Sequence, residues 1–263
     1  MNDVARLLDV GLEAARAASM IVLDGAGNAL DVRSKGQGDW VSEIDERAEL
    51  AVREVFAKHT PHIPVFGEEG GGALGEEVWC VDPLDGTSNF LHGLPAVGVS
   101  IALIRDGSPV VAVVDAPFLR TTWTATLGGG AFQDDQRISV SNQPMQRAIV
   151  ATGFPFRRPE LRAPYLEIFK DVIEAVEDVR RCGAASLDLC WTASGVFDGY
   201  FELALSPWDV AAGGLIVREA GGVVTDWWGS ATPWLESGNI VAANPSVFSG
   251  LIVHTEGFPQ KLV

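Results

Sequence analysis

Three acidic segments that lie far apart in the sequence constrain the fold of this chain most strongly. They are residues 67–70, which read Gly-Glu-Glu-Gly, residues 82–90, and Asp209, which precedes a long Ala/Gly-rich run. Carboxylates beside Gly-rich turns are typical of sites where a hard divalent cation such as Mg²⁺ shares oxygen ligands with a substrate phosphate. We therefore expect a fold that brings the three segments together around bound metal.

The length and composition of the chain indicate a folded protein with a substantial core. Its 263 residues are 47% hydrophobic, which suits one large unit or two closely packed subdomains. We expect an N-terminal α+β subdomain, residues 1–145, that carries most metal ligands. A C-terminal α/β subdomain, residues 146–263, would carry Asp209 and the substrate contacts.

Charge and cysteine content exclude several classes of function. The formal charge of −16 disfavours direct nucleic-acid binding, which depends on clustered Lys and Arg. The same charge repels a phosphorylated small molecule unless bound cations reverse the sign locally. Cys80, Cys182 and Cys190 form no C-x-x-C pair, so we expect neither a disulfide framework nor a zinc site.

The sequence contains no segment that we interpret as a membrane helix or a secretion signal. Its longest apolar stretch, about residues 94–104, is well below the ~18 residues that a membrane-spanning helix needs. The N-terminus lacks a basic start and a continuous apolar stretch. We therefore expect no membrane association and a cytoplasmic location.

Hydrophobic periodicity predicts different arrangements in the two parts of the chain. Residues 3–23 predict an amphipathic helix, and a second helix follows Ser42 as a plausible N-cap and ends before Pro61. Residues 97–126 and the stretch after three glycines predict an antiparallel meander. Later, strands and helices alternate, with helices at 159–177, 184–194 and 208–219 and strands at 149–152, near 179, and at 197–203, 223–227 and 240–243.

Residues 82–90 form a turn that is dense in oxygen ligands. Asp82 and Asp85 supply carboxylates, Leu84 a main-chain carbonyl and Thr87 a hydroxyl, while Gly86 permits a tight turn. A helix that began just after Gly86 would offer free N–H groups to a phosphate oxygen. An Asp-Gly pair alone more often marks a solvated turn, but the nine-residue string is too particular for that interpretation.

The other two acidic segments each allow a structural interpretation. Glu68 and Glu69 suit an exposed acidic loop as well as a metal site. Asp209 suits the first turn of a helix that has Ser206 as N-cap and Pro207 at its first position, where the helix dipole favours an acid. An Asp at a helix start can also bind metal, so both interpretations can hold together.

The three segments resemble the signature motifs of the inositol monophosphatase family. The matching residues are the Gly-Glu-Glu loop, the string Asp-Pro-Leu-Asp-Gly-Thr-x-Asn-Phe, and the Trp-Asp that opens a helix ending in Glu-Ala-Gly-Gly. The resemblance extends over nearly the whole chain. It implies a layered αβαβα sandwich of the sugar-phosphatase type and a lithium-sensitive homodimer. It also implies Mg²⁺-dependent hydrolysis of inositol 1-phosphate and related polyol or sugar phosphates by metal-activated water, with two to three ions per site.

The resemblance also implies individual roles for the metal-binding residues. Asp82 bridges two metals, Leu84 contributes its carbonyl to the first, and Asp85 binds the second. Glu68 binds the first metal and holds the attacking water, whereas Glu69 is not a direct ligand. Asp209 binds the second metal and contacts a substrate hydroxyl.

Further roles follow from the resemblance with less specific residue patterns. Thr87, hydrogen-bonded to Asp45, orients the water, although Asp45 also suits a capping box with Ser42. Lys35 matches a lysine near a mobile third-metal site, and a solvated surface lysine fits it almost as well. His92 follows the central motif, and we expect it to be structural.

Substrate contacts are expected from Asp85, Gly86 and Thr87, from residues 181–186 including Gly183 and Ala185, and from Asp209. Glu202 precedes Asp209 by seven residues, as the inositol-contacting Glu of the family does, and would accept hydrogen bonds from sugar hydroxyls. A charged acceptor in a pocket discriminates strongly between substrates. The alternative for Glu202 is an exposed strand residue.

Several rival functions share the same fold. Fructose-1,6-bisphosphatase and histidinol-phosphatase remain open, whereas 3′-phosphoadenosine 5′-phosphatases usually carry Lys-Glu-Phe where this chain has Ser88, Asn89 and Phe90. A rival from another class is a regulatory protein that uses the fold as an interaction surface, as some bacterial relatives do with transcription machinery.

Overall fold

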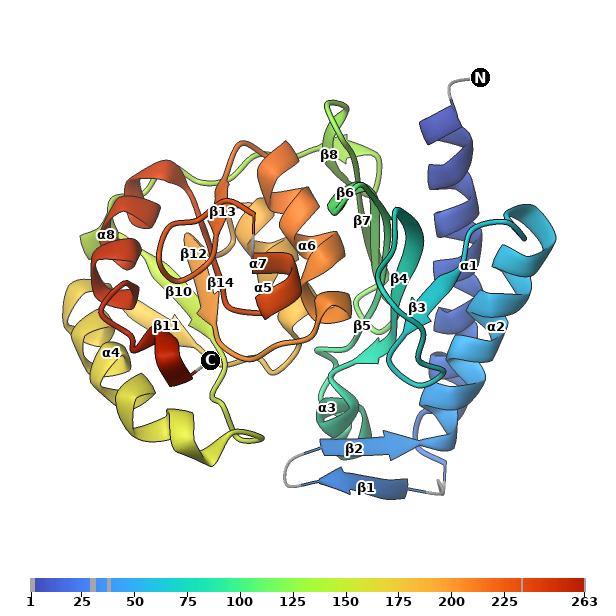
Figure 1. The fold of residues 1–263 in the computed structure, drawn as a ribbon, viewed down its shortest axis with the longest axis horizontal. Coiled ribbons are helices and arrows are strands. Elements are labelled where there is room, and N and C mark those ends of the chain that lie inside the picture. Colours follow the sequence, from blue (N-terminus) through green and yellow to red (C-terminus); the bar gives the residue numbers. More distant parts are fainter. Residues whose placement is uncertain (1–2, 29–31, 37–38, 233, 263) are drawn as a thin grey trace.

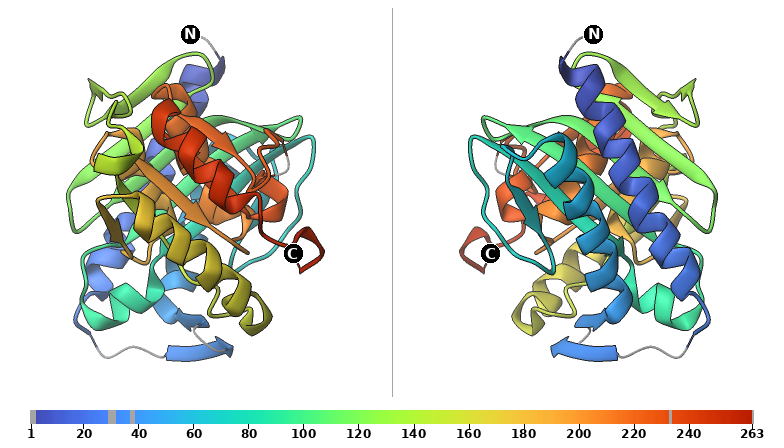
Figure 2. Two further views of the ribbon diagram at one scale, coloured as in Figure 1. Left: turned by 90° about the vertical axis from the view of Figure 1, so that its left-hand side faces the viewer. Right: turned by 90° about the vertical axis from the view of Figure 1, so that its right-hand side faces the viewer.

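The chain forms five alternating layers of helices and sheets (Figure 1). The structure, a computed structural model, describes residues 3–28, 32–36, 39–232 and 234–262. Helices α1 (Asp3–Gly25) and α2 (Glu43–His59) cover one outer face, and α4 (Arg162–Ala175) and α8 (Pro245–Thr255) cover the opposite one (Figure 2). Between the two sheets lie α5 (Ala185–Ala193) and α6 (Pro207–Glu219). The expected layered αβαβα fold is confirmed.

The larger sheet has seven strands in the order β3-β4-β5-β6-β7-β8-β9. Strands β3 and β4 are parallel, and all later neighbours are antiparallel, so the expected meander is present. The strands are β3 (Val65–Gly67), β4 (Glu77–Asp85), β5 (Gly98–Arg105), β6 (Ser108–Ala116), β7 (Thr121–Thr126), β8 (Gly130–Gln133) and β9 (Gln136–Arg137).

Strand β4 was not expected from the sequence, because it ends in the Asp-Pro-Leu-Asp string. The pairing of β4 with β5 shifts register between Asp82 and Asp85. Pro83 falls inside this irregularity, where its missing N–H breaks no regular pair. The interior strand therefore tolerates a proline, and the irregularity places two aspartates at its C-terminal end.

Alternation along the strands divides the buried residues between two cores. On β4, Trp79 and Val81 pack toward α1 and α2, whereas Val78 and Cys80 pack toward α5 and α6. This two-residue period is what a sheet covered by helices on both faces requires. Both faces of the strand are consequently buried.

The smaller sheet is mixed and has the order β11-β10-β12-β14-β13. Strand β10 is parallel to β11 and β12, while β14 is antiparallel to β12 and β13. Its members are β10 (Ile149–Thr152), β11 (Asp178–Arg180), β12 (Gly199–Glu202), β13 (Val223–Thr225) and β14 (Ile240–Ala243).

Two helices differ from the expectation for the C-terminal part. A 3₁₀ turn, Pro159–Leu161, precedes α4, which is shorter than the predicted 159–177. Pro164 lies in the first turn of α4, where its missing N–H costs nothing. Helix α8 was not predicted, although Asn244 caps it by accepting hydrogen bonds from the N–H groups of its first turn.

The Ala/Gly-rich run after Asp209 forms α6, which is buried on both sides. A Cβ at Gly213 would lie 2.5 Å from Leu189 of α5, and one at Gly214 would lie 2.5 Å from Trp234. Glycines therefore permit the close packing of a helix enclosed between two sheets.

Smaller elements complete the description. They are the hairpin β1 (Val32–Gly36) and β2 (Asp39–Ser42), the helices α3 (Thr87–His92) and α7 (Trp234–Ser237), and two further 3₁₀ turns, Met145–Arg147 and Gln260–Leu262. None of the helices in the described ranges is both long and apolar enough to cross a membrane. The predicted boundary between subdomains at residue 145 separates the two sheets, yet α5 and α6 pack within one core that joins both sheets. The division into subdomains stays a prediction.

Candidate active site

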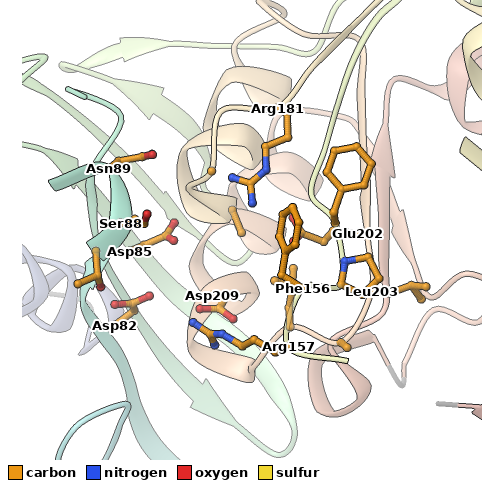
Figure 3. Close-up of a pocket in the computed structure, with 18 of the residues that line it drawn as sticks. Asp82, Asp85, Ser88, Asn89, Phe156, Arg157, Arg181, Glu202, Leu203 and Asp209 are labelled. Carbon is orange, nitrogen blue, oxygen red and sulfur yellow. The ribbon is translucent and has the colours of Figure 1, made fainter. Parts of the chain in front are cut away.

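The three acidic segments meet at a cavity of about 390 Å³ (Figure 3). Its walls come from the end of β4, the start of α3, the loops after β3 and β10, the loop before α5, the end of β12 and the start of α6. The expected site residues that line it are Glu68, Asp82, Leu84, Asp85, Gly86, Thr87, Gly183, Ala185, Glu202 and Asp209.

Backbone and hydroxyl donors fix the carboxylates on β4. The N–H of Leu84 donates to Asp82 at 2.9 Å. Asp85 accepts two hydrogen bonds from Ser186 at the start of α5, one from its N–H at 2.7 Å and one from its hydroxyl at 2.6 Å. Ser186 stood within the predicted 181–186 stretch, but its role in holding Asp85 was not foreseen, because the contact joins α5 to β4, which are far apart in the sequence.

Asp209 reaches the same place from the first turn of α6. Ser206 precedes the helix, Pro207 is its first residue, and the N–H of Ser206 donates to Asp209 at 2.7 Å. The helix-capping interpretation is therefore right. It coexists with the placement of Asp209 beside the β4 carboxylates, as Figure 3 shows.

Crowding and burial disfavour negative charge in this cluster. Oxygen atoms of Asp82, Asp85 and Asp209 lie within 4.8 Å of one another. Burial and then repulsion from neighbouring carboxylates, Glu68 included, raise the pKa of Asp82 and of Asp209 well above the ordinary value. Burial is also the main reason why the pKa of Asp85 rises to about 6. An all-oxygen set with excess negative charge fits a hard divalent cation.

Thr87 connects the site to α2. Its hydroxyl lies 2.9 Å from the carboxylate of Asp45 and 3.2 Å from the carbonyl of Leu84. Asp45 also accepts hydrogen bonds from the N–H and the hydroxyl of Ser42, so the capping box is present as well. A hydroxyl has one proton, and the shorter contact directs it to Asp45, which leaves the Thr87 lone pairs toward the cavity.

The Gly-Glu-Glu-Gly loop follows β3 and places Glu68 in the cavity wall. The N–H of Glu68 donates to the carbonyl of Val81 on β4 at 3.2 Å, which ties the loop to the strand that carries Asp82. Glu69 does not belong to the cavity lining. His92, the last residue of α3, is exposed and does not line the cavity either.

The opposite wall carries residues suited to polar substrate groups. Glu202 accepts a hydrogen bond from the Tyr200 hydroxyl at 2.6 Å, and burial raises its pKa to about 7. Gly153 makes room for it, since a Cβ there would collide with the Glu202 carboxylate. Arg157 points toward Asp209, and Arg181 lies over the ring of Phe156 at 5.7 Å.

Sequence reasoning missed Arg157, which lines this wall, and also Tyr200 and Gly153, which contact or make room for Glu202. Tyr200, Gly153 and Arg157 belong to segments that the motifs do not include, and Thr152-Gly153 ahead of two phenylalanines was the only local signal. The side chain of Lys35 lies outside the described residues, so its predicted place near a third metal stays a prediction.

Comparison with known proteins places these features in a family context. The model of the "Inositol monophosphatase family" matches residues 3–257. A "Putative Nus factor SuhB" of Neisseria meningitidis serogroup B is 45% identical over 251 residues, which are 93% of this chain and 96% of that protein. An "Inositol-1-monophosphatase" of Rhizobium meliloti is 44% identical over 226 residues, 84% of this chain and 85% of that protein.

A solved structure agrees with the fold over almost the full length. The native crystal structure of the extragenic suppressor protein suhB from Bartonella henselae has a TM-score of 0.91 and 36% sequence identity. The match covers 95% of this chain and 98% of the Bartonella chain.

Proposed function

This chain belongs to the inositol monophosphatase family, and we propose that it is a Mg²⁺-dependent phosphomonoesterase that hydrolyses inositol 1-phosphate and related polyol or sugar phosphates. The convergence of Asp82, Asp85 and Asp209 within 4.8 Å carries the proposal. Together with Glu68 these aspartates form a group of four carboxylates. Their negative charge repels an anionic phosphate unless cations are bound.

Asp82, Asp85, Asp209, Glu68 and the Leu84 carbonyl would hold two to three Mg²⁺ ions. Such ions neutralise phosphate charge, lower the pKa of water and stabilise a leaving oxygen. The raised pKa values of Asp82 and Asp209 support this assignment, because bound cations would remove the repulsion that causes part of the shift.

The remaining residues would orient the reactants. Thr87, whose proton is directed to Asp45, can accept a hydrogen bond from a water and hold it in line with the phosphorus. Glu68 on the neighbouring loop would accept a hydrogen bond from the second O–H group of that water. Gly86, at the start of α3, lets the backbone approach the phosphate.

Substrate selection would depend on the far wall. Ionised Glu202 would accept a hydrogen bond from a ring hydroxyl, with Tyr200 fixing its orientation. Gly183 and Ala185 have small or no side chains and leave room for the ring. Loss of a hydroxyl partner for Glu202 would cost about 1–3 kcal/mol, roughly a 5- to 150-fold loss in kcat/KM.

Phosphate release provides the test. The purified protein would be assayed with inositol 1-phosphate, fructose 1,6-bisphosphate, histidinol phosphate and 3′-phosphoadenosine 5′-phosphate, each with Mg²⁺, with chelator and with Li⁺. A lithium-sensitive, Mg²⁺-dependent preference for inositol 1-phosphate supports the proposal. Preference for another of these substrates would support the metal-dependent phosphatase reaction and contradict the assignment of inositol 1-phosphate as substrate. Absence of activity on all four would overturn the proposal.

A bisphosphate is the second candidate substrate, and two arginines favour it. Arg157 and Arg181 line the cavity of a chain whose net charge is −16. Among the described residues, Arg181 lies over the ring of Phe156 and takes part in no salt bridge. A guanidinium held by stacking across the cavity from the acidic cluster suits a second phosphate group.

Arg181→Gln separates the two candidates. A charge-assisted hydrogen bond contributes about 1.5–3 kcal/mol, so kcat/KM for fructose 1,6-bisphosphate should fall roughly 10- to 100-fold. The value for inositol 1-phosphate should stay within about twofold if the arginine binds only a second phosphate. Arg180→Gln is the matched control, since Arg180 pairs with Asp178 and does not line the cavity. Equal effects on both substrates would count against a second phosphate site.

A protein-binding role is the remaining alternative, and the name "Nus factor SuhB" carried by several relatives favours it. In that case Asp82→Asn would abolish hydrolysis and leave partner binding intact. Homodimer formation and a cytoplasmic location are retained as proposals for this chain.

A further inference from the structure

Helix α2 carries a row of polar side chains on the face that it turns toward the candidate site. Asp45, Glu49 and Arg53 are spaced four residues apart, which places them on one side of a helix. Asp45 and Glu49 are 2% exposed although both are acidic. Buried carboxylates require partners, and the partners of this row belong to two different segments of the site.

Glu49 holds the loop that carries Glu68. Its two carboxylate oxygens accept hydrogen bonds from the N–H groups of Glu69 and Gly70, each at 2.8 Å. Arg53 donates to Glu49 at 2.7 Å and to the carbonyl of Gly71 at 3.1 Å. The loop is therefore attached to α2 through three consecutive residues, 69–71.

The glycines of the Gly-Glu-Glu-Gly motif are needed for this attachment. A Cβ at Gly67 would lie 2.6 Å from the Glu49 carboxylate, and one at Gly70 would lie 2.5 Å from it and 2.6 Å from Arg53. Neither glycine has the positive φ that would give a conformational reason for its presence. Space for Glu49 and Arg53 accounts for the glycines on both sides of the two glutamates.

We propose that α2 is the positioning element of the active site, with Glu49 and Arg53 as positioning residues for Glu68. One turn N-terminal of Glu49 on the same helix, Asp45 holds Thr87 at 2.9 Å. The two attachment points are one helical turn apart, about 6 Å along the axis. The helix thus sets the spacing between Thr87 and Glu68. The inference rests on the proposed function only in that this function assigns Thr87 to the water and Glu68 to the metal.

Glu49→Gln tests the proposal, because it keeps the size of the side chain and removes one of the two acceptors. The amide hydrogens of Glu69 and Gly70 should exchange at least about 10-fold faster in the metal-free variant. The dissociation constant for Mg²⁺, measured by calorimetry, should rise about 10- to 100-fold, as expected for loss of a group that orients a ligand. With saturating Mg²⁺, kcat should fall while KM for substrate changes less than about twofold.

Two further variants make the result specific. Gly70→Ala displaces the Glu49 carboxylate without altering a proposed ligand, and it should reproduce the Glu49→Gln phenotype. The double variant should be no worse than either single one, because both act through the same contact. Glu54→Gln, on the exposed side of α2, is the matched control and should behave as the original chain does.

The outcomes separate this inference from the proposed function. Faster amide exchange and weaker Mg²⁺ binding support the positioning role even if no phosphate ester is hydrolysed. Unchanged exchange and unchanged Mg²⁺ affinity in Glu49→Gln overturn it even if the protein is an active phosphatase. If Glu49→Gln does not fold, Mg²⁺ affinity in folded Gly70→Ala decides, and an unchanged value there also overturns the proposal.

Discussion

Asp82, Asp85 and Asp209 each accept a hydrogen bond from a backbone N–H group. Leu84 donates to Asp82, Ser186 to Asp85 and Ser206 to Asp209. These bonds stabilise the charged forms, but burial outweighs them and the pKa values still rise. The residues are therefore oriented in advance for a cation at a cost in the stability of the metal-free protein.

Asp82→Asn is expected to separate activity from stability. An amide keeps the acceptor for the Leu84 N–H and removes one buried charge, so the metal-free variant should unfold at a higher temperature than the original chain. The rise in Tm on adding Mg²⁺ should disappear, and kcat/KM should fall more than about 100-fold. Thermal unfolding with and without chelator, and phosphate release, measure both effects.

Asp171→Asn on the exposed face of α4 is the control for this substitution. It should change neither Tm nor turnover. Substantial Mg²⁺-dependent activity in Asp82→Asn would remove Asp82 from the metal site.

Among the secondary-structure elements, the register of β10 against β12 shapes the cavity wall that carries Glu202. Thr152 pairs with Phe201 in this parallel ladder, so the next residues, Gly153 and Glu202, lie side by side at the C-terminal ends of β10 and β12. Position 153 requires glycine, because a Cβ there would collide with the Glu202 carboxylate. Carboxyl ends of parallel strands are common places for ligands.

Gly153→Ala should therefore impair substrate binding more than folding. The added Cβ would displace the flexible end of Glu202, so KM for inositol 1-phosphate should rise about 5-fold or more, given the value of a charged hydrogen bond. Steady-state kinetics would measure KM, and a Mg²⁺ titration would show whether metal binding is unchanged. Gly75→Ala, where a Cβ would meet nothing within 4 Å, is the control. A KM within twofold of the original would exclude a role for the Glu202 position in recognition.

At the scale of the whole molecule, the carboxylates link stability to pH. The folded, metal-free protein binds protons more tightly at Asp85, with a pKa of about 6, and at Glu202, with a pKa of about 7, than the unfolded chain does. Free energy of unfolding therefore falls as pH rises from about 4 to about 7, because the native state holds more protons in that interval. Above about pH 7 both carboxyl groups are ionised in the native state, and their burial lowers the free energy of unfolding by a constant amount.

Mg²⁺ should stabilise the protein more at high pH than at low pH. At pH 8 the ions neutralise ionised carboxylates, whereas at pH 5.5 they must displace protons first. The increase in Tm caused by Mg²⁺ at about 100 times its dissociation constant should be larger at pH 8 than at pH 5.5. Equal increases at both pH values would contradict the linkage.

Features of the fold and site that depend on neighbours in the sequence could be predicted, whereas features that depend on contacts between distant segments could not. The motif at 82–90, the capping of α6 by Ser206 and the meander depend on neighbours in the chain, and sequence reasoning placed them. Strand β4 and helix α8 were missed. Pro83 inside an interior strand is tolerated only because of a register shift against β5, which local propensity does not contain.

Residue types and their spacing in the chain are enough to identify the chemical groups of the candidate site. They define oxygen ligands, a tight turn at Gly86 and a helix start at Pro207, all of which depend on local backbone geometry. The distant groups that support them become apparent only from the packing of separate elements. Ser186 on Asp85, Gly153 under Glu202 and the attachment of the glutamate loop to Glu49 are contacts between separate elements, fixed by layer packing and strand register.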